Sequence, residues 1–194
     1  CNYRVIDARN SAEGSLGHGH CADILLKNMN AKYGMIVDSD VAFLKKNWDL
    51  QLESKLKDNV VIVGAGTEKD HHHYYNFPYT IMIFFLTEAM KLSNVTFVPG
   101  LKKMVLDEQN ADIFGRNPGD TIFQDTSWQL PLKIKGAGHR GIALPLLSPR
   151  LSSPNLKFMQ SDMRGEEHQR DGEPIFTHLG RAASRNFWHD PVVK

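Results

Sequence analysis

An amphipathic helix between two short strand-like segments is the feature that most constrains the fold of this chain. Residues 21–33 place apolar side chains at the i, i+3, i+4 and i+7 positions of one helical face, namely Ala22, Leu25, Leu26 and Met29. Residues 3–7 before this helix and 34–37 after it are typical of short buried strands. The alternation predicts an α/β domain with a mainly parallel, Rossmann-like sheet flanked by helices, whose ligands bind at the carboxyl ends of the strands.

The pattern continues along most of the chain. We expect helices over 47–56 and 126–135, strands over 59–63 and 95–98, and loops over 10–19 and 67–78. Residues 79–92 carry the apolar cluster 81–86 and continue as a helix through 87–92. From residue 148 onward, Pro, Ser and charged residues predict a loop and a loosely packed tail, with 161–173 as a mobile loop. We therefore expect one domain over 1–194, in which the loop-rich part 148–194 closes the site.

Composition excludes several classes of protein. The 194 residues suit one ordinary domain. Lys and Arg number 23 against 22 Asp and Glu, so the net charge of +1 gives no general electrostatic reason to expect nucleic acid as a partner. The longest apolar run, 81–86, is far shorter than the roughly 20 residues of a transmembrane helix, and no leader pattern opens the chain. With only Cys1 and Cys21, a reducing, cytoplasmic location is expected.

Two carboxylates directly follow the predicted strand 34–37. Asp38 and Asp40, separated by Ser39, stand where a strand leaves the sheet. Such a pair can hold a hard divalent cation through oxygen and leave other positions for water and a diphosphate. The alternative is that Asp-x-Asp occurs here by chance on the surface, since the motif is short.

Several segments, in order, resemble a glycosyltransferase of the GT-A fold that uses a nucleotide-sugar. The resemblance rests on Ser-Leu-Gly-His-Gly-His-Cys-Ala-Asp-Ile-Leu from residue 15, Tyr-Gly-Met-Ile-Val-Asp-Ser-Asp-Val from residue 33, Trp48, and Val-Ile-Val-Gly from residue 61. In that family the Asp-x-Asp motif holds Mn²⁺ or Mg²⁺ against the diphosphate of the donor, such as a UDP- or GDP-sugar. The family's opening strand and base-binding loop have no counterpart here. We therefore expect that the domain lacks its first strand and that natural sequence is missing upstream of Cys1.

Two later segments extend the resemblance. Asp-Thr-Ser-Trp from residue 125 resembles the segment with the acidic catalytic base, and residues 174–184 resemble the late strand whose histidine completes the metal site. The resemblance thus implies Asp125 as base and Asp38, Asp40 and His178 as metal ligands. Asp40 is expected to bind the ion more directly, and Asp38 to reach the ribose or the ion through water. In the alternative readings Asp125 caps the helix at Thr126 and His178 is structural.

Further residues are candidates for contact with the donor, namely Asp7, His18, Ser39 and Arg181. Asp7 ends the first predicted strand, His18 precedes the helix that leads to Asp38, and Arg181 could clamp a phosphate. A surface turn, a loop without ligand contact and a solvated basic tail are the respective alternatives. Histidines 71–73 are not expected to share one ion, because neighbours in a loop point in different directions.

The function expected from these residues is transfer of a sugar from a nucleotide-sugar to the hydroxyl of a glycan or another acceptor. An aspartate base implies direct displacement with inversion at the anomeric carbon. A nucleotidyltransferase or phosphohydrolase using the same aspartates is an alternative. A non-catalytic module that binds a nucleotide-sugar or glycan is another.

Overall fold

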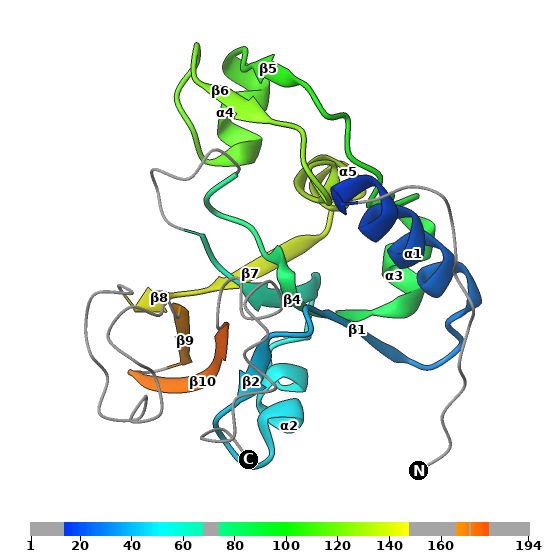
Figure 1. Cartoon of the computed structure of the whole chain (residues 1–194), viewed down its shortest axis with the longest axis vertical. Coiled ribbons are helices and arrows are strands. Elements are labelled where there is room, and N and C mark those ends of the chain that lie inside the picture. Colours follow the sequence, from blue (N-terminus) through cyan, green and yellow to red (C-terminus); the bar gives the residue numbers. More distant parts are fainter. Residues whose placement is uncertain (1–13, 68–73, 148–165, 171, 179–194) are drawn as a thin grey trace.

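The computed structural model describes residues 14–67, 74–147, 166–170 and 172–178 (Figure 1). The predicted strand 3–7 with Asp7, histidines 71–73 and Arg181 lie outside the described residues. The described part is a mixed α/β structure with two four-stranded sheets and a two-stranded one. No helix in this part combines the length and apolar character needed to cross a membrane.

The central sheet has four strands in the order β1-β4-β3-β7. These strands are β1 (Tyr33–Val37), β3 (Val60–Ala65), β4 (Tyr79–Leu86) and β7 (Arg140–Leu144). β4 runs antiparallel to both of its neighbours, and only β3 and β7 form a parallel pair. The expectation of a mainly parallel sheet was therefore wrong, because β4 lies between β1 and β3 and runs against them.

The apolar cluster 81–86 explains why the sequence did not predict β4 as a strand separate from the following helix. It forms most of β4, and the helix α3 (Thr87–Leu92) begins only after it. Met82 and Phe84 face one hydrophobic cluster, whereas Ile83 and Phe85 face the other. Because both faces of the strand are buried, its sequence is a continuous apolar run, which periodicity alone cannot distinguish from a buried helix.

Helices cover one face of the central sheet. Beside α3 lies α1 (Gly14–Asn28), and Figure 1 shows the two packed together at one side of the molecule. Buried side chains of α4 (Glu108–Phe114) and α5 (Leu130–Gly136) complete this cluster. α1 begins well before residue 21, so much of the expected loop 10–19 is helical, whereas residues 95–98 form no strand. α5 begins four residues later than the predicted helix 126–135.

The opposite face carries a second sheet in the order β2-β10-β9-β8. Its strands are β2 (Val41–Phe43), β8 (Leu146–Leu147), β9 (Glu166–Arg170) and β10 (Glu173–His178), and α2 (Trp48–Glu53) packs nearby. β9 and β10 replace part of the loop expected after residue 148. The antiparallel pair β5 (Lys103–Val105) and β6 (Thr121–Phe123), with α4 in the connection between them, stands at the top of Figure 1.

Candidate metal centre

The turn after β1 presents the two aspartates. The Asp38 amide still donates a hydrogen bond to the Ile81 carbonyl of β4, at 2.9 Å. The chain therefore leaves the central sheet at Asp38. The Val41 amide then donates to the Asp38 carbonyl, at 3.2 Å, and starts β2. Within this turn Ser39 is exposed and Asp40 is buried. The predicted position of the Asp-x-Asp motif at the carboxyl end of a strand is therefore confirmed.

Strand pairing delivers the third side chain. β10 runs antiparallel to β2 and places His178 opposite Val41, the residue after Asp40. His178 Nε2 lies 3.3 Å from Asp40 Oδ1. A one-residue slip of this register would turn the imidazole to the other face of the sheet. The pairing of β2 and β10 thus brings together residues that are far apart in the sequence.

Aromatic packing and polar contacts hold this register. The ring of Phe43 stacks on Trp48, with the ring centroids 3.7 Å apart. It also makes an edge-to-face contact with Phe176, with the centroids 6.2 Å apart. Phe176 also stacks on His168, with the two ring centroids 4.5 Å apart. The Leu44 amide donates to Ile175, and Lys45 forms an ion pair with Glu173.

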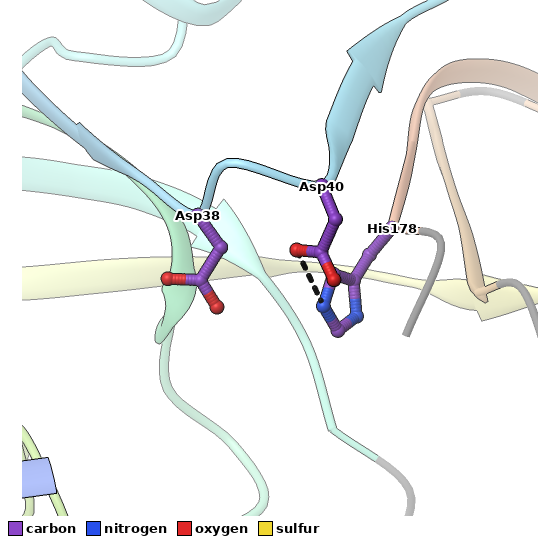
Figure 2. Close-up of side chains that lie close together, drawn as sticks. All are labelled: Asp38, Asp40 and His178. Carbon is purple, nitrogen blue, oxygen red and sulfur yellow. Dashed lines mark ion pairs between the residues drawn. The ribbon is translucent and has the colours of Figure 1, made fainter. Parts of the chain in front are cut away.

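Asp38, Asp40 and His178 form a possible metal-binding group. One ligand atom from each residue lies within 4.8 Å of the others. Figure 2 shows the carboxylate of Asp40 facing the imidazole of His178, with the carboxylate of Asp38 alongside. Two carboxylates favour Mg²⁺ or Mn²⁺, and an imidazole is a common ligand of the softer transition metals, so this donor set fits Mn²⁺ well. Three ligands leave positions for water or a phosphate oxygen.

The charges of the centre favour a cation. Burial raises the pKa of the Asp38 carboxyl above its ordinary value, and the charge of Asp40 adds to this effect. His18 and His178 act in the opposite direction. A divalent ion bound between the two carboxylates would relieve their mutual repulsion.

His18 lies beside this centre. It stands on α1, with Nε2 3.8 Å from Asp38 Oδ1, and its side chain is 40% exposed. The sequence placed His18 in a loop, whereas the structure places it on a helix. Its expected role in binding the donor phosphates stays a prediction.

Asp125 is connected to the same end of α1. Its Oδ1 accepts a hydrogen bond from the Thr126 amide at 2.7 Å, and the Thr126 hydroxyl donates to the Ser15 carbonyl at 3.1 Å. Ser15 precedes His18 by three residues, about 4.5 Å along the helix axis. The segment with Asp125 and the aspartate turn therefore both contact the first turns of α1.

The alternative role of Asp125 as a helix cap is not what the structure shows. α5 begins at Leu130, and Gln129 occupies the N-cap position. Residues 126–129 form turns, in which the Trp128 amide donates to the Asp125 carbonyl. Asp125 is half-buried, and its role as a base stays a prediction.

Sequence reasoning missed the buried residues that support the Asp125 segment, above all Ser127, Tyr74 and Thr80. The Tyr74 side chain is itself buried. A buried hydroxyl has no spacing or composition signal, so nothing in the sequence could have revealed this contact.

Searches of protein-family models, curated proteins and solved structures return no match to this chain.

Proposed function

We propose that this chain is a metal-dependent glycosyltransferase of GT-A type that transfers a sugar from a UDP- or GDP-sugar to an acceptor hydroxyl, with inversion. The observation that carries the proposal is the convergence of Asp38, Asp40 and His178 at the end of β1. The Asp-x-Asp turn and the late histidine are the elements that the resemblance requires of a metal site. The proposal also assigns a base, Asp125, near the same helix end.

The proposed chemistry follows from the charges of the reaction. Cleavage of the bond between sugar and diphosphate builds negative charge on the leaving group. A Mn²⁺ or Mg²⁺ ion held by Asp38, Asp40 and His178 would supply Lewis-acid stabilisation of that charge. His18, next to Asp38, would donate a hydrogen bond to a phosphate oxygen. Asp125 would accept the proton of the acceptor hydroxyl as this oxygen attacks the anomeric carbon.

The test separates this function from the alternatives. The purified chain is incubated with a panel of UDP- and GDP-sugars and a panel of glycan acceptors, with Mn²⁺ or with a chelator. Products are identified by mass spectrometry. We expect a nucleoside diphosphate and a glycosylated acceptor only with the metal, and neither from Asp40→Asn. The matched control is Asp58→Asn, because Asp58 is an exposed carboxylate for which Asn is a close replacement.

Other products would contradict the proposal. Formation of a nucleoside triphosphate or release of orthophosphate would indicate a nucleotidyltransferase or a phosphohydrolase. Metal-dependent binding of a nucleotide-sugar without turnover of any donor would indicate a binding module. Thermal shift with each donor measures this binding, because a ligand of the folded state raises stability as RT ln(1 + [L]/Kd).

A further inference from the structure

Ser127 has an unusual backbone conformation in a fully buried position. Five non-glycine residues of the described part have positive φ, namely Asn47, Asp58, Asn94, Leu101 and Ser127. The other four are exposed, whereas the exposed fraction of Ser127 is 0%. A left-handed conformation is unfavourable for a residue with a Cβ, although Asn and Asp tolerate it better. Residues held in this way persist where the surroundings impose the conformation, and they cluster at functional sites.

The Ser127 hydroxyl belongs to a chain of buried hydroxyls. Its Oγ lies 3.0 Å from the Tyr74 hydroxyl and 3.1 Å from Thr80 Oγ1. Tyr74 donates its single proton to the Pro78 carbonyl, at 3.0 Å. Because each hydroxyl has one proton, Ser127 donates to Tyr74 and Thr80 donates to Ser127. Every member of the chain is thus satisfied, and the order of donors is fixed.

Three directions of contact immobilise the short segment 125–127. The hydroxyl chain ties Ser127 to Thr80 on β4, and the Ser127 amide donates to the Phe97 carbonyl at 3.1 Å. Thr126 binds α1 through Ser15. The side chain of Asp125 accepts a hydrogen bond from the Thr126 amide, which belongs to the peptide directly before these anchors. The orientation of the Asp125 carboxylate therefore depends on the backbone at 126–127.

We propose that Ser127 is a positioning residue, whose left-handed backbone and buried hydroxyl hold the Asp125 carboxylate toward the acceptor hydroxyl. This inference rests on the proposed function, because it takes Asp125 as the base. A base has to stand within hydrogen-bond reach of the proton it accepts, and misplacement by about 1 Å can cost on the order of 10²-fold in rate. Fixing the carboxylate by buried contacts provides this precision.

Ser127→Gly tests the hydroxyl without straining the backbone, since glycine adopts positive φ freely. We expect kcat for transfer to fall about tenfold or more, with unchanged donor KM and unchanged Mn²⁺ affinity. Thr80→Val should also lower kcat, whereas Thr80→Ser, which keeps the hydroxyl, should retain the kcat of the parent. The matched control is Asn94→Gly, an exposed positive-φ residue after α3, which should change nothing.

A double-mutant cycle identifies the residue through which Ser127 acts. In an Asp125→Asn background, Ser127→Gly should cause no further loss of transfer, because the carboxylate it positions is gone. Independent losses that multiply would overturn the proposal. A merely structural role would also raise KM in parallel with the fall in kcat.

Hydrogen exchange gives a readout that does not depend on turnover. The amides of Thr126, Ser127 and Trp128 all donate within this region, so their exchange should accelerate in Ser127→Gly while the central sheet stays protected. Unchanged exchange would overturn the positioning role. An inactive parent chain would overturn the proposed function, and faster exchange would then show only that Ser127 orders this segment.

Discussion

Asp40 and Asp38 have different surroundings although only one residue separates them. Asp40 is 7% exposed and faces His178, whereas Asp38 contacts His18 on α1. In the metal-free chain their negative charges repel each other, and the charge of Asp40 contributes to the raised pKa of Asp38. Both carboxylates thus favour a bound cation, but only Asp40 contacts His178, the third residue of the candidate metal group.

Asp40→Asn should abolish most of the Mn²⁺ affinity while the chain stays folded. Even indirect partners of metal ligands typically contribute about 10- to 100-fold to affinity, so removal of a ligand should exceed this range. Isothermal titration calorimetry with Mn²⁺, on this variant and on the Asp58→Asn control, measures the change. Parent-like affinity in Asp40→Asn would remove Asp40 from the metal site.

Asp125→Asn should separate binding from chemistry. Asparagine keeps the shape and can still accept from the Thr126 amide, but it cannot take up a proton from the acceptor. We expect transfer to fall by about 10²-fold or more at saturating donor and Mn²⁺, with nearly unchanged donor and metal affinities. Retained transfer would exclude Asp125 as the base, and inversion would lose its main support.

At the scale of elements, the sequence predicted what depends on local pattern. Ala22, Leu25 and Leu26 of the helical stripe fall within α1, which ends one residue before Met29, and strands β1 and β3 appear where apolar runs predicted them. The cluster 81–86 was not separated from the following helix, because a strand buried on both faces lacks period-two alternation. The direction of β4 and the pairing of β2 with β10 depend on contacts distant in sequence, which local pattern does not determine.

In the candidate site, too, local sequence pattern predicts some residues, whereas others depend on contacts between distant segments. The aspartate turn after β1 follows from an apolar strand that ends in polar residues. His178 was placed in the site by resemblance, and the register of β10 supplies the physical reason. Ser127 could not have been found from the sequence, because both its φ of 67° and its hydroxyl partners result from tertiary packing.

Gly19 fixes the distance between α1 and the neighbouring backbone. A Cβ at this position would lie 2.6 Å from the Phe97 carbonyl oxygen and 2.9 Å from the Val98 Cα. Gly19→Ala should therefore destabilise the chain by about 1–3 kcal/mol through overpacking, although Gly to Ala in a helix ordinarily stabilises it. Denaturant unfolding measures the change.

A second glycine provides the matched control for Gly19→Ala. At Gly136, the last residue of α5, a Cβ would meet nothing within 4 Å, so Gly136→Ala should be neutral or stabilising. Equal effects of the two substitutions would contradict the close approach of α1 to residues 97–98.

For the whole molecule, the candidate metal centre joins the two sheets. Asp38 ends the central sheet, whereas His178 belongs to the second sheet. His178→Ala should therefore lower Mn²⁺ affinity and reduce the stabilisation that Mn²⁺ gives, which for the parent reaches about 2.7 kcal/mol at 100 times Kd. Thermal unfolding at increasing Mn²⁺ measures both effects.

A histidine at the other end of the sheet is the control for His178→Ala. His139 precedes β7 at the edge opposite the aspartate turn, so His139→Ala should leave the Mn²⁺-dependent shift intact. An equal loss in both variants would show that the shift does not come from the proposed centre.

The dependence of stability on pH should report the cost of ionising Asp38 when no cation is bound. The pKa of Asp38 is raised from its ordinary value of 3.8, mainly by burial, so the folded chain holds this proton more tightly than the unfolded chain. The free energy of unfolding should therefore fall as the pH rises from 3.8 through the raised pKa, and the loss persists above it. Asp38→Asn does not ionise and escapes this loss.

In a chelator, Asp38→Asn should unfold at a higher temperature than the parent at neutral pH, and the difference should shrink as the pH approaches 3.8. Saturating Mn²⁺ should reverse the order, because only the parent retains both carboxylates for the ion. Thermal unfolding across this pH range, with chelator and with Mn²⁺, measures both. A variant less stable than the parent in chelator at neutral pH would show that the Asp38 charge stabilises the fold, and the centre would then not be arranged to bind a cation.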